Sequence, residues 1–143
     1  MEPLLITSSL IFGREVVTQT ISGSTKNILS GVNSIMEDED FAFKKLLEDC
    51  DLKSRVDIIN TYLGEINENN FTSDSIKMSL KYLSDILKKI ETEIQTIEIK
   101  IKEHKELWFH RFRTPEYKTM LQNLVTHIKI LDERFNLFIK IKN

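Results

Sequence analysis

The sequence predicts an all-α fold, an elongated antiparallel four-helix bundle formed by a single domain over residues 1–143. Two long segments space their apolar residues by alternating steps of three and four, which places those residues on one face of a helix. The chain has only 4 Gly and 2 Pro, fewer turn-forming residues than a many-stranded sheet needs. A hydrophobic content of 41% is enough for a buried core and argues against a disordered chain.

The first predicted helix covers residues 4–35. Its apolar residues recur along a segment that is rich in Ser, Thr and Gly and has few charges. Small residues let helices approach closely, although Gly and β-branched residues lower helix propensity. A helix with few charges is typically buried. We therefore predict one long helix, with Gly23 as the position of a kink, packed within the bundle or against a partner subunit.

The second predicted helix covers residues 40–66. It follows an acidic run at residues 37–40, and its apolar residues are spaced by three and four from Leu52 to Ile66. Asp51 is expected to break or recap this helix, because an aspartate side chain suits an N-cap. Gly64 and the run from Asn67 to Asn70 favour turns and are expected to end it.

The third predicted helix covers residues 74–111 and has the most regular apolar pattern. A 3.5-residue repeat of this kind is typical of coiled-coil packing. Ser73 or Asp74 is expected to cap the helix at its N-terminus, and a helix of this length extends over roughly 55 Å. The residues of the repeat are Ile76, Leu80, Leu83, Leu87, Ile90, Ile94, Ile97 and Ile101.

The fourth predicted helix covers residues 115–141. Thr114, Pro115 and Glu116 precede its apolar pattern, an order that is typical of a helix start. The short connection from the third helix predicts an antiparallel hairpin of the two long helices. Further apolar residues lie off the main face, so we expect more than one neighbouring helix. These off-face residues are Met120, Val125, Ile130, Leu137, Ile139 and Ile141.

Charge and cysteine content narrow the classes of function and the cellular location. Lys plus Arg is 20 and Asp plus Glu is 22, whereas a dedicated DNA-binding domain is usually clearly basic, which leaves only a local basic patch open. Cys50 is the only cysteine, so no internal disulfide can form. The N-terminus lacks the basic leader and cleavage site of a signal peptide, and residues 3–13 are too few to span a bilayer. We therefore predict an intracellular, cytoplasmic protein, with association with a membrane or a virion as the alternatives.

No catalytic or metal-binding motif occurs in the sequence. The three histidines, His104, His110 and His127, show neither the spacing of a helical zinc site nor the Glu-x-x-His of a di-iron bundle. A phosphate-binding Gly-rich loop and a Ser/His/Asp arrangement are also lacking. We therefore expect no enzymatic activity, no cofactor, no metal and no small-molecule substrate.

The segment at the end of the third predicted helix mixes aromatic and basic residues. Positive charge there offsets the helix macrodipole, and the aromatic rings can close the end of the bundle. The same residues can also anchor a protein partner, since Trp and Arg are favoured at interfaces, or can stack on a single-stranded nucleic acid. The partner-binding candidates are Trp108, Phe109, Arg111, Phe112 and Arg113.

The start of the first predicted helix offers an alternative role at a membrane. An apolar helix with few charges can detach from a bundle and insert into a lipid surface, although burial within the fold explains the same composition. The residues that would enter the membrane are Leu4, Leu5, Ile6, Leu10, Ile11 and Phe12.

Two resemblances accompany these patterns. The start Met1-Glu2-Pro3, followed by an apolar helix rich in small residues up to Gly31, resembles the four-helix domains of the HeLo and MLKL type. That resemblance concerns the architecture and the first helix, and it implies membrane binding in cell-death signalling. No specific motif accompanies it.

The second resemblance lies in the half of the chain with the third and fourth helices. That half is similar to small uncharacterised helical proteins of large DNA viruses of protists, which implies a viral accessory or virion-associated protein but no chemistry. The resemblance is carried by His104-Lys105, Trp108-Phe109, Arg113, Tyr117 and the run Ile130-Leu131-Asp132-Glu133-Arg134.

We therefore expect a non-enzymatic interaction or structural protein that acts through contacts with a protein partner or with a second copy of itself. A membrane-acting four-helix module is the alternative, and a nucleic-acid accessory protein is a third interpretation. The sequence leaves the partner and the oligomeric state open.

Overall fold

The computed structural model describes residues 2–37, 41–66, 71, 73–106 and 118–143; within these ranges, side chains are described except for residues 2–16, 41 and 42. The described residues form helices and no strand, which confirms the predicted all-α class. Within these described ranges, five helices occur where four were predicted. They are α1 (Glu2–Met36), α2 (Phe41–Cys50), α3 (Leu52–Glu65), α4 (Asp74–Glu106) and α5 (Lys118–Lys142).

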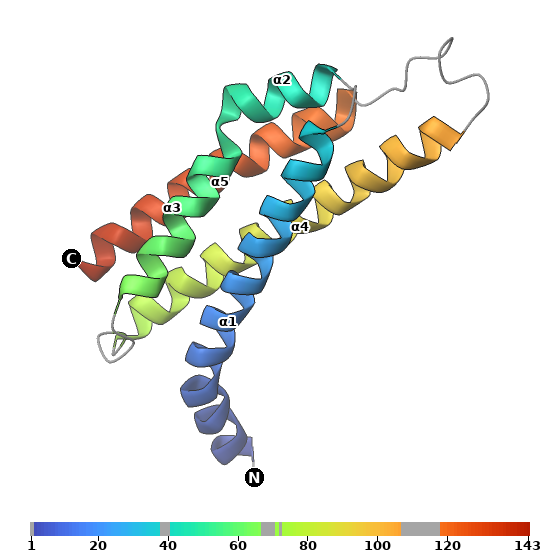
Figure 1. Cartoon of the computed structure of the whole chain (residues 1–143). Coiled ribbons are helices and arrows are strands. Elements are labelled where there is room, and N and C mark those ends of the chain that lie inside the picture. The colour runs from blue at the N-terminus through green and yellow to red at the C-terminus, as the bar shows by residue number, and fades with distance from the viewer. Residues whose placement is uncertain (1, 38–40, 67–70, 72, 107–117) are drawn as a thin grey trace.

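The additional helix arises because the second predicted helix is divided at Asp51. The break falls where the sequence predicted it, but its cause differs from the predicted cap. Asp51 makes no capping hydrogen bond through its side chain, and its backbone is left-handed, with φ 52° and ψ 42°. A left-handed residue turns the chain out of the helix direction, so α2 and α3 point in different directions (Figure 1).

The other helix boundaries follow the sequence closely. α1 is helical through Gly23, the position expected to be kinked. The hydroxyl oxygen of Ser73 accepts a hydrogen bond of 3.2 Å from the Ile76 amide, which identifies Ser73 as the N-cap of α4. α3 ends at Glu65, and Ile66 is extended. The predicted end of the third helix and the predicted cap at residues 114–116 lie outside the described residues.

α4 has the most buried face and lies between α1 and α5. All eight residues of its predicted apolar repeat are buried, as are Leu124, Ile128, Leu131 and Phe138 of α5. The rings of Phe71 and Phe138 meet edge to face, with centroids 5.9 Å apart. The apolar patterns therefore predicted correctly which faces of the two long helices form the core.

Neighbouring helices run in both relative directions. α4 and α5 are antiparallel, as the predicted hairpin requires, because Glu93 contacts His127 and the earlier Tyr82 contacts the later Arg134. α1 and α4 run in the same direction, since Asn27 lies by Glu91 and the later Gly31 lies by the later Ile94. A β-carbon added at Gly31 would meet the next turn of α4, so the two helices are close where they cross (Figure 1).

The contacts of α1 with α4 and with α3 also contain polar side chains. Glu91 is buried, and its carboxylate accepts a hydrogen bond of 3.4 Å from the Asn27 amide and lies 3.6 Å from the Lys88 ammonium. The Thr25 hydroxyl donates to the Ser22 carbonyl at 2.9 Å and lies 3.1 Å from Asn60 Oδ1 on α3. Since buried polar groups favour one alignment in which they are paired, these contacts help to fix how α1 lies on the bundle.

Candidate interaction surface

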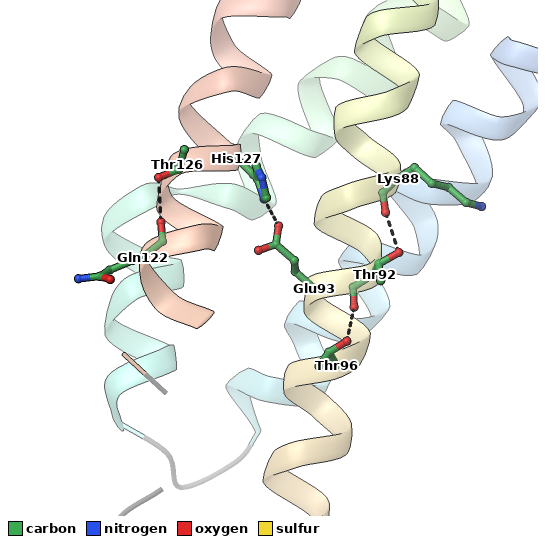
Figure 2. Close-up of polar contacts among 7 residues, drawn as sticks. All are labelled: Lys88, Thr92, Glu93, Thr96, Gln122, Thr126 and His127. Atoms are coloured by element: carbon green, nitrogen blue, oxygen red, sulfur yellow. Dashed lines mark hydrogen bonds and ion pairs between the residues drawn. The ribbon is translucent and has the colours of Figure 1, made fainter. Parts of the chain in front are cut away.

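The outer face of the α4–α5 pair carries two contacts that join the helices. Near the middle of α4, Glu93 and the Nδ1 atom of His127 point toward one another across the gap between the helices (Figure 2). Toward the start of α4, Nη1 of Arg134 donates a hydrogen bond of 2.7 Å to the Tyr82 carbonyl, and the guanidinium carbon lies 5.8 Å from the centroid of the Tyr82 ring. These contacts fix the alignment of α5 along α4.

A shallow polar groove of about 670 Å³ extends between these two contacts. It contains acidic, basic and neutral side chains, so its charges largely balance. The lining residues are Tyr82, Asp85, Lys88, Lys89, Thr92, Glu93, Asn123, His127 and Arg134. Figure 2 shows the Lys88 side chain directed away from His127, and its ammonium lies near Glu91 on the α1 side of α4.

In the groove, the His127 imidazole and the Thr92 hydroxyl are each bonded to another group. His127, the histidine that lines it, is paired with Glu93. The Thr92 and Thr96 hydroxyls donate to carbonyls one turn earlier on α4, at 3.0 and 2.9 Å (Figure 2). Among the described residues, no three His, Cys, Asp or Glu side chains are grouped so that they could hold a metal ion.

Beyond the Tyr82–Arg134 contact, the same face becomes apolar. Met78 is 55% exposed, Tyr82 48%, Leu137 51% and Ile141 37%. Met78 lies one turn before Tyr82 on α4, whereas Leu137 and Ile141 lie one and two turns after Arg134 on α5. Because the two helices are antiparallel and Arg134 reaches Tyr82, all four side chains lie at the same end of the pair.

We refer to Met78, Tyr82, Arg134, Leu137 and Ile141 as the α4–α5 patch. Met, Tyr and Arg are enriched in protein–protein interfaces, and clustered exposed apolar side chains mark such surfaces more than scattered ones do. The other large exposed apolar side chains of the described residues lie on different parts of the molecule: Ile58 on α3, Ile99 on α4 and Val125 on α5.

A second hollow, of about 440 Å³, lies between the C-terminal parts of α1 and α4. Ile99 is its exposed apolar residue, and two lysines contribute positive charge. The residues that line it are Ser34, Ile35, Glu98, Ile99, Ile101, Lys102 and Lys105. Its apolar surface is less exposed than that of the α4–α5 patch, because Ile35 and Ile101 belong to the core.

The residues that the sequence predicted as a partner site all lie outside the described part of the chain. They are Trp108, Phe109, Arg111, Phe112 and Arg113, within residues 107–117. The membrane candidates Leu4, Leu5, Ile6, Leu10, Ile11 and Phe12 lie on α1, but their side chains are not among those described. Within the described residues, no helix combines the length and the apolar character that crossing a bilayer requires.

Sequence reasoning identified part of the α4–α5 patch. Leu137 and Ile141 were recognised as apolar residues that lie off the main face of their helix, but they were expected to contact another helix of the bundle. Met78 and Tyr82 were missed. The available signal was the presence of apolar residues off the main face of both hairpin helices, at positions that an antiparallel alignment brings to one end.

Comparison with known proteins confirms the predicted similarity to an uncharacterised protein of a large virus of protists. The chain is 30% identical over 87 residues to an uncharacterised protein of Acanthamoeba polyphaga mimivirus. The match covers 59% of this chain and 42% of the viral protein, so it spans less than half of that relative. No protein-family model and no solved structure matches the chain.

Proposed function

We propose that this protein is a non-enzymatic helical interaction protein and that the α4–α5 patch is its contact surface. The observation that supports this proposal is the set of four large, exposed apolar side chains at one end of the α4–α5 pair. Full burial of an apolar side chain of this size contributes about 1.5–3 kcal/mol. Covering the patch would therefore stabilise an association between proteins.

The partner that we propose is a second copy of the chain. In a twofold-symmetric contact the same surface meets itself, so its charges must be able to pair with themselves. Exposed residues of both signs lie on the two helices of the patch, with Lys81 and Asp85 on α4 and Glu133 and Lys140 on α5. The net charge of −2 also gives only weak repulsion between copies.

The similarity to a mimivirus protein supports a role in a virus, as an accessory or virion-associated protein. Proteins that assemble through helical surfaces suit such a role without any bound cofactor. The relative is itself uncharacterised, so it supplies no substrate, partner or activity for this chain.

Substitutions on one helix test the proposal. Leu137→Asp places a charge within the α4–α5 patch, and Val125→Asp places the same charge at another exposed position of α5, where Val125 is 42% exposed. We expect sedimentation velocity to show that Leu137→Asp dissociates the dimer, whereas Val125→Asp leaves it intact. Equal behaviour of the two variants would contradict a contact through this patch.

The membrane alternative and the nucleic-acid interpretation draw on residues whose side chains are not described. Both are testable with the same protein. Flotation with anionic liposomes that is lost when residues 1–35 are deleted, while the rest of the chain stays helical by circular dichroism, would support the membrane role. Binding to single-stranded nucleic acid that weakens steeply with salt and on combined Arg111→Ala and Arg113→Ala substitution would support the third interpretation.

A further inference from the structure

The turn between α2 and α3 depends on one residue in an unfavourable backbone conformation. Asp51 has φ 52° and ψ 42°, in the left-handed region that side chains other than glycine disfavour. Its side chain makes no capping hydrogen bond that would compensate. The surrounding contacts must therefore hold Asp51 in this conformation.

Arg55 makes the contacts that span this turn. Its Nε atom donates a hydrogen bond of 2.6 Å to the carbonyl of Cys50, the last residue of α2, and its Nη1 atom pairs with Asp132 on α5. One guanidinium on α3 thus joins the end of α2 to α5. Both side chains of the ion pair are more than one third exposed, so water and salt ions can compete for it.

α2 contributes few buried side chains to the core. Of its described side chains, Phe43 and Leu47 are buried, whereas Leu46 and Cys50 are partly buried. α3 has a larger core contribution, with four buried residues. Its buried residues are Leu52, Val56, Ile59 and Leu63.

We propose that Asp51 is a hinge and that Arg55 is the latch that keeps it closed. Loss of the contacts of Arg55 to Cys50 and Asp132 makes α2 leave the core as a unit more often, while α1, α3, α4 and α5 stay packed. Relief of the left-handed backbone at Asp51 favours this opening. Segments with few buried contacts commonly open separately from the rest of a fold. Opening exposes Phe43 and Leu47, which are four residues apart and form an apolar stripe on α2.

Cys50 provides a built-in reporter, because it is the only cysteine and lies at the hinge. Alkylation of the full-length protein with iodoacetamide measures how often its thiol is accessible. We expect Arg55→Met and Asp132→Asn each to increase the alkylation rate about fivefold or more. Moderate salt should accelerate the wild-type reaction in the same way.

The direction of the effect separates opening from a change in thiol chemistry. Burial raises the pKa of the Cys50 thiol, while the nearby Arg55 guanidinium lowers it and Asp49 raises it. Removal of Arg55 would raise this pKa further, reduce the thiolate fraction and slow alkylation. A faster reaction in Arg55→Met therefore reports opening. Lys53→Met is the control, because it removes an exposed cation of α3 without changing the latch, and it should not accelerate the reaction.

Hydrogen exchange distinguishes hinge opening from general unfolding. In Arg55→Met we expect faster exchange of the amides of α2 and unchanged exchange in α4. Loss of protection in both helices to the same extent would show that the whole fold is destabilised and would overturn the proposal. Alkylation of Arg55→Met and Asp132→Asn at the wild-type rate would overturn it as well.

Discussion

Gly31 lies where α1 crosses α4, and the residues around it leave no room for a side chain. A β-carbon there would lie 2.4 Å from Cγ2 of Ile94 and 2.5 Å from Oε1 of Glu98. We expect Gly31→Ala to lower the free energy of unfolding by about 1–3 kcal/mol, because the buried Ile94 must shift. Urea denaturation followed by circular dichroism measures this change.

Gly23 provides the matched control on the same helix. An added β-carbon there has no neighbour within 4 Å, so Gly23→Ala should raise the free energy of unfolding by up to about 1 kcal/mol through helix propensity alone. Equal effects of the two substitutions would contradict a close crossing at Gly31.

Asp51 offers a second test at a single residue. Glycine adopts the left-handed conformation without steric cost, so Asp51→Gly should raise the free energy of unfolding by about 1 kcal/mol. The same substitution at Asp49, an exposed residue within α2, should lower it by several tenths to about 1 kcal/mol. Thermal unfolding of both variants shows whether each substitution raises or lowers the free energy of unfolding. A lower free energy of unfolding in both variants would argue against the left-handed turn.

These residues also show where sequence reasoning reaches its limit. The break at Asp51 was predicted, but aspartate occurs both as a capping residue and, at a steric cost that glycine avoids, in left-handed turns, and the local sequence does not decide between them. Similarly, Gly23 and Gly31 look alike in the sequence. Gly31 is required only because α4 lies directly against it, whereas Gly23 has no neighbour there.

At the scale of the helix, α4 provides the clearest comparison between a predicted core face and an exposed face. Ile90 is on the apolar repeat and fully buried, whereas Ile99 is off the repeat and 56% exposed. We expect Ile90→Ala to cost about 2–5 kcal/mol of unfolding free energy and Ile99→Ala to cost less than about 0.5 kcal/mol. Guanidinium denaturation measures both changes. Similar losses of unfolding free energy in the two variants would contradict the predicted core face of α4.

The faces of the helices were predictable, but the choice of neighbours was not. The spacing from Ile76 to Ile101 predicts which side of α4 is apolar, and the structure confirms it. The same pattern does not say which helix covers that side, because any apolar face can pack against any other. The direct packing of α1 on α4, at Asn27 beside Glu91 and Gly31 beside Ile94, thus became visible only in the structure.

At the scale of the whole molecule, the candidate surface depends on the assembled helices. Tyr82 and Leu137 belong to different helices, and they lie near one another because Arg134 fixes the alignment of α5 on α4. A sequence pattern marks Leu137 as apolar but cannot show that it stays exposed beside the described helices. Exposure is a property of the complete arrangement. The interface predicted at Trp108 to Arg113 rests on aromatic and basic residues, and it stays a prediction because these residues lie outside the described part of the chain.

The proposed dimer is tested most directly by the mass of the unmodified protein in solution. Light scattering coupled to size-exclusion chromatography, over a range of concentrations and with and without anionic liposomes, measures that mass. We expect it to rise with concentration from the 16.8 kDa of the single chain to twice that value and to be unaffected by liposomes. A mass of 16.8 kDa at every concentration would contradict the proposed dimer, and co-elution of that single chain with liposomes would favour the membrane role.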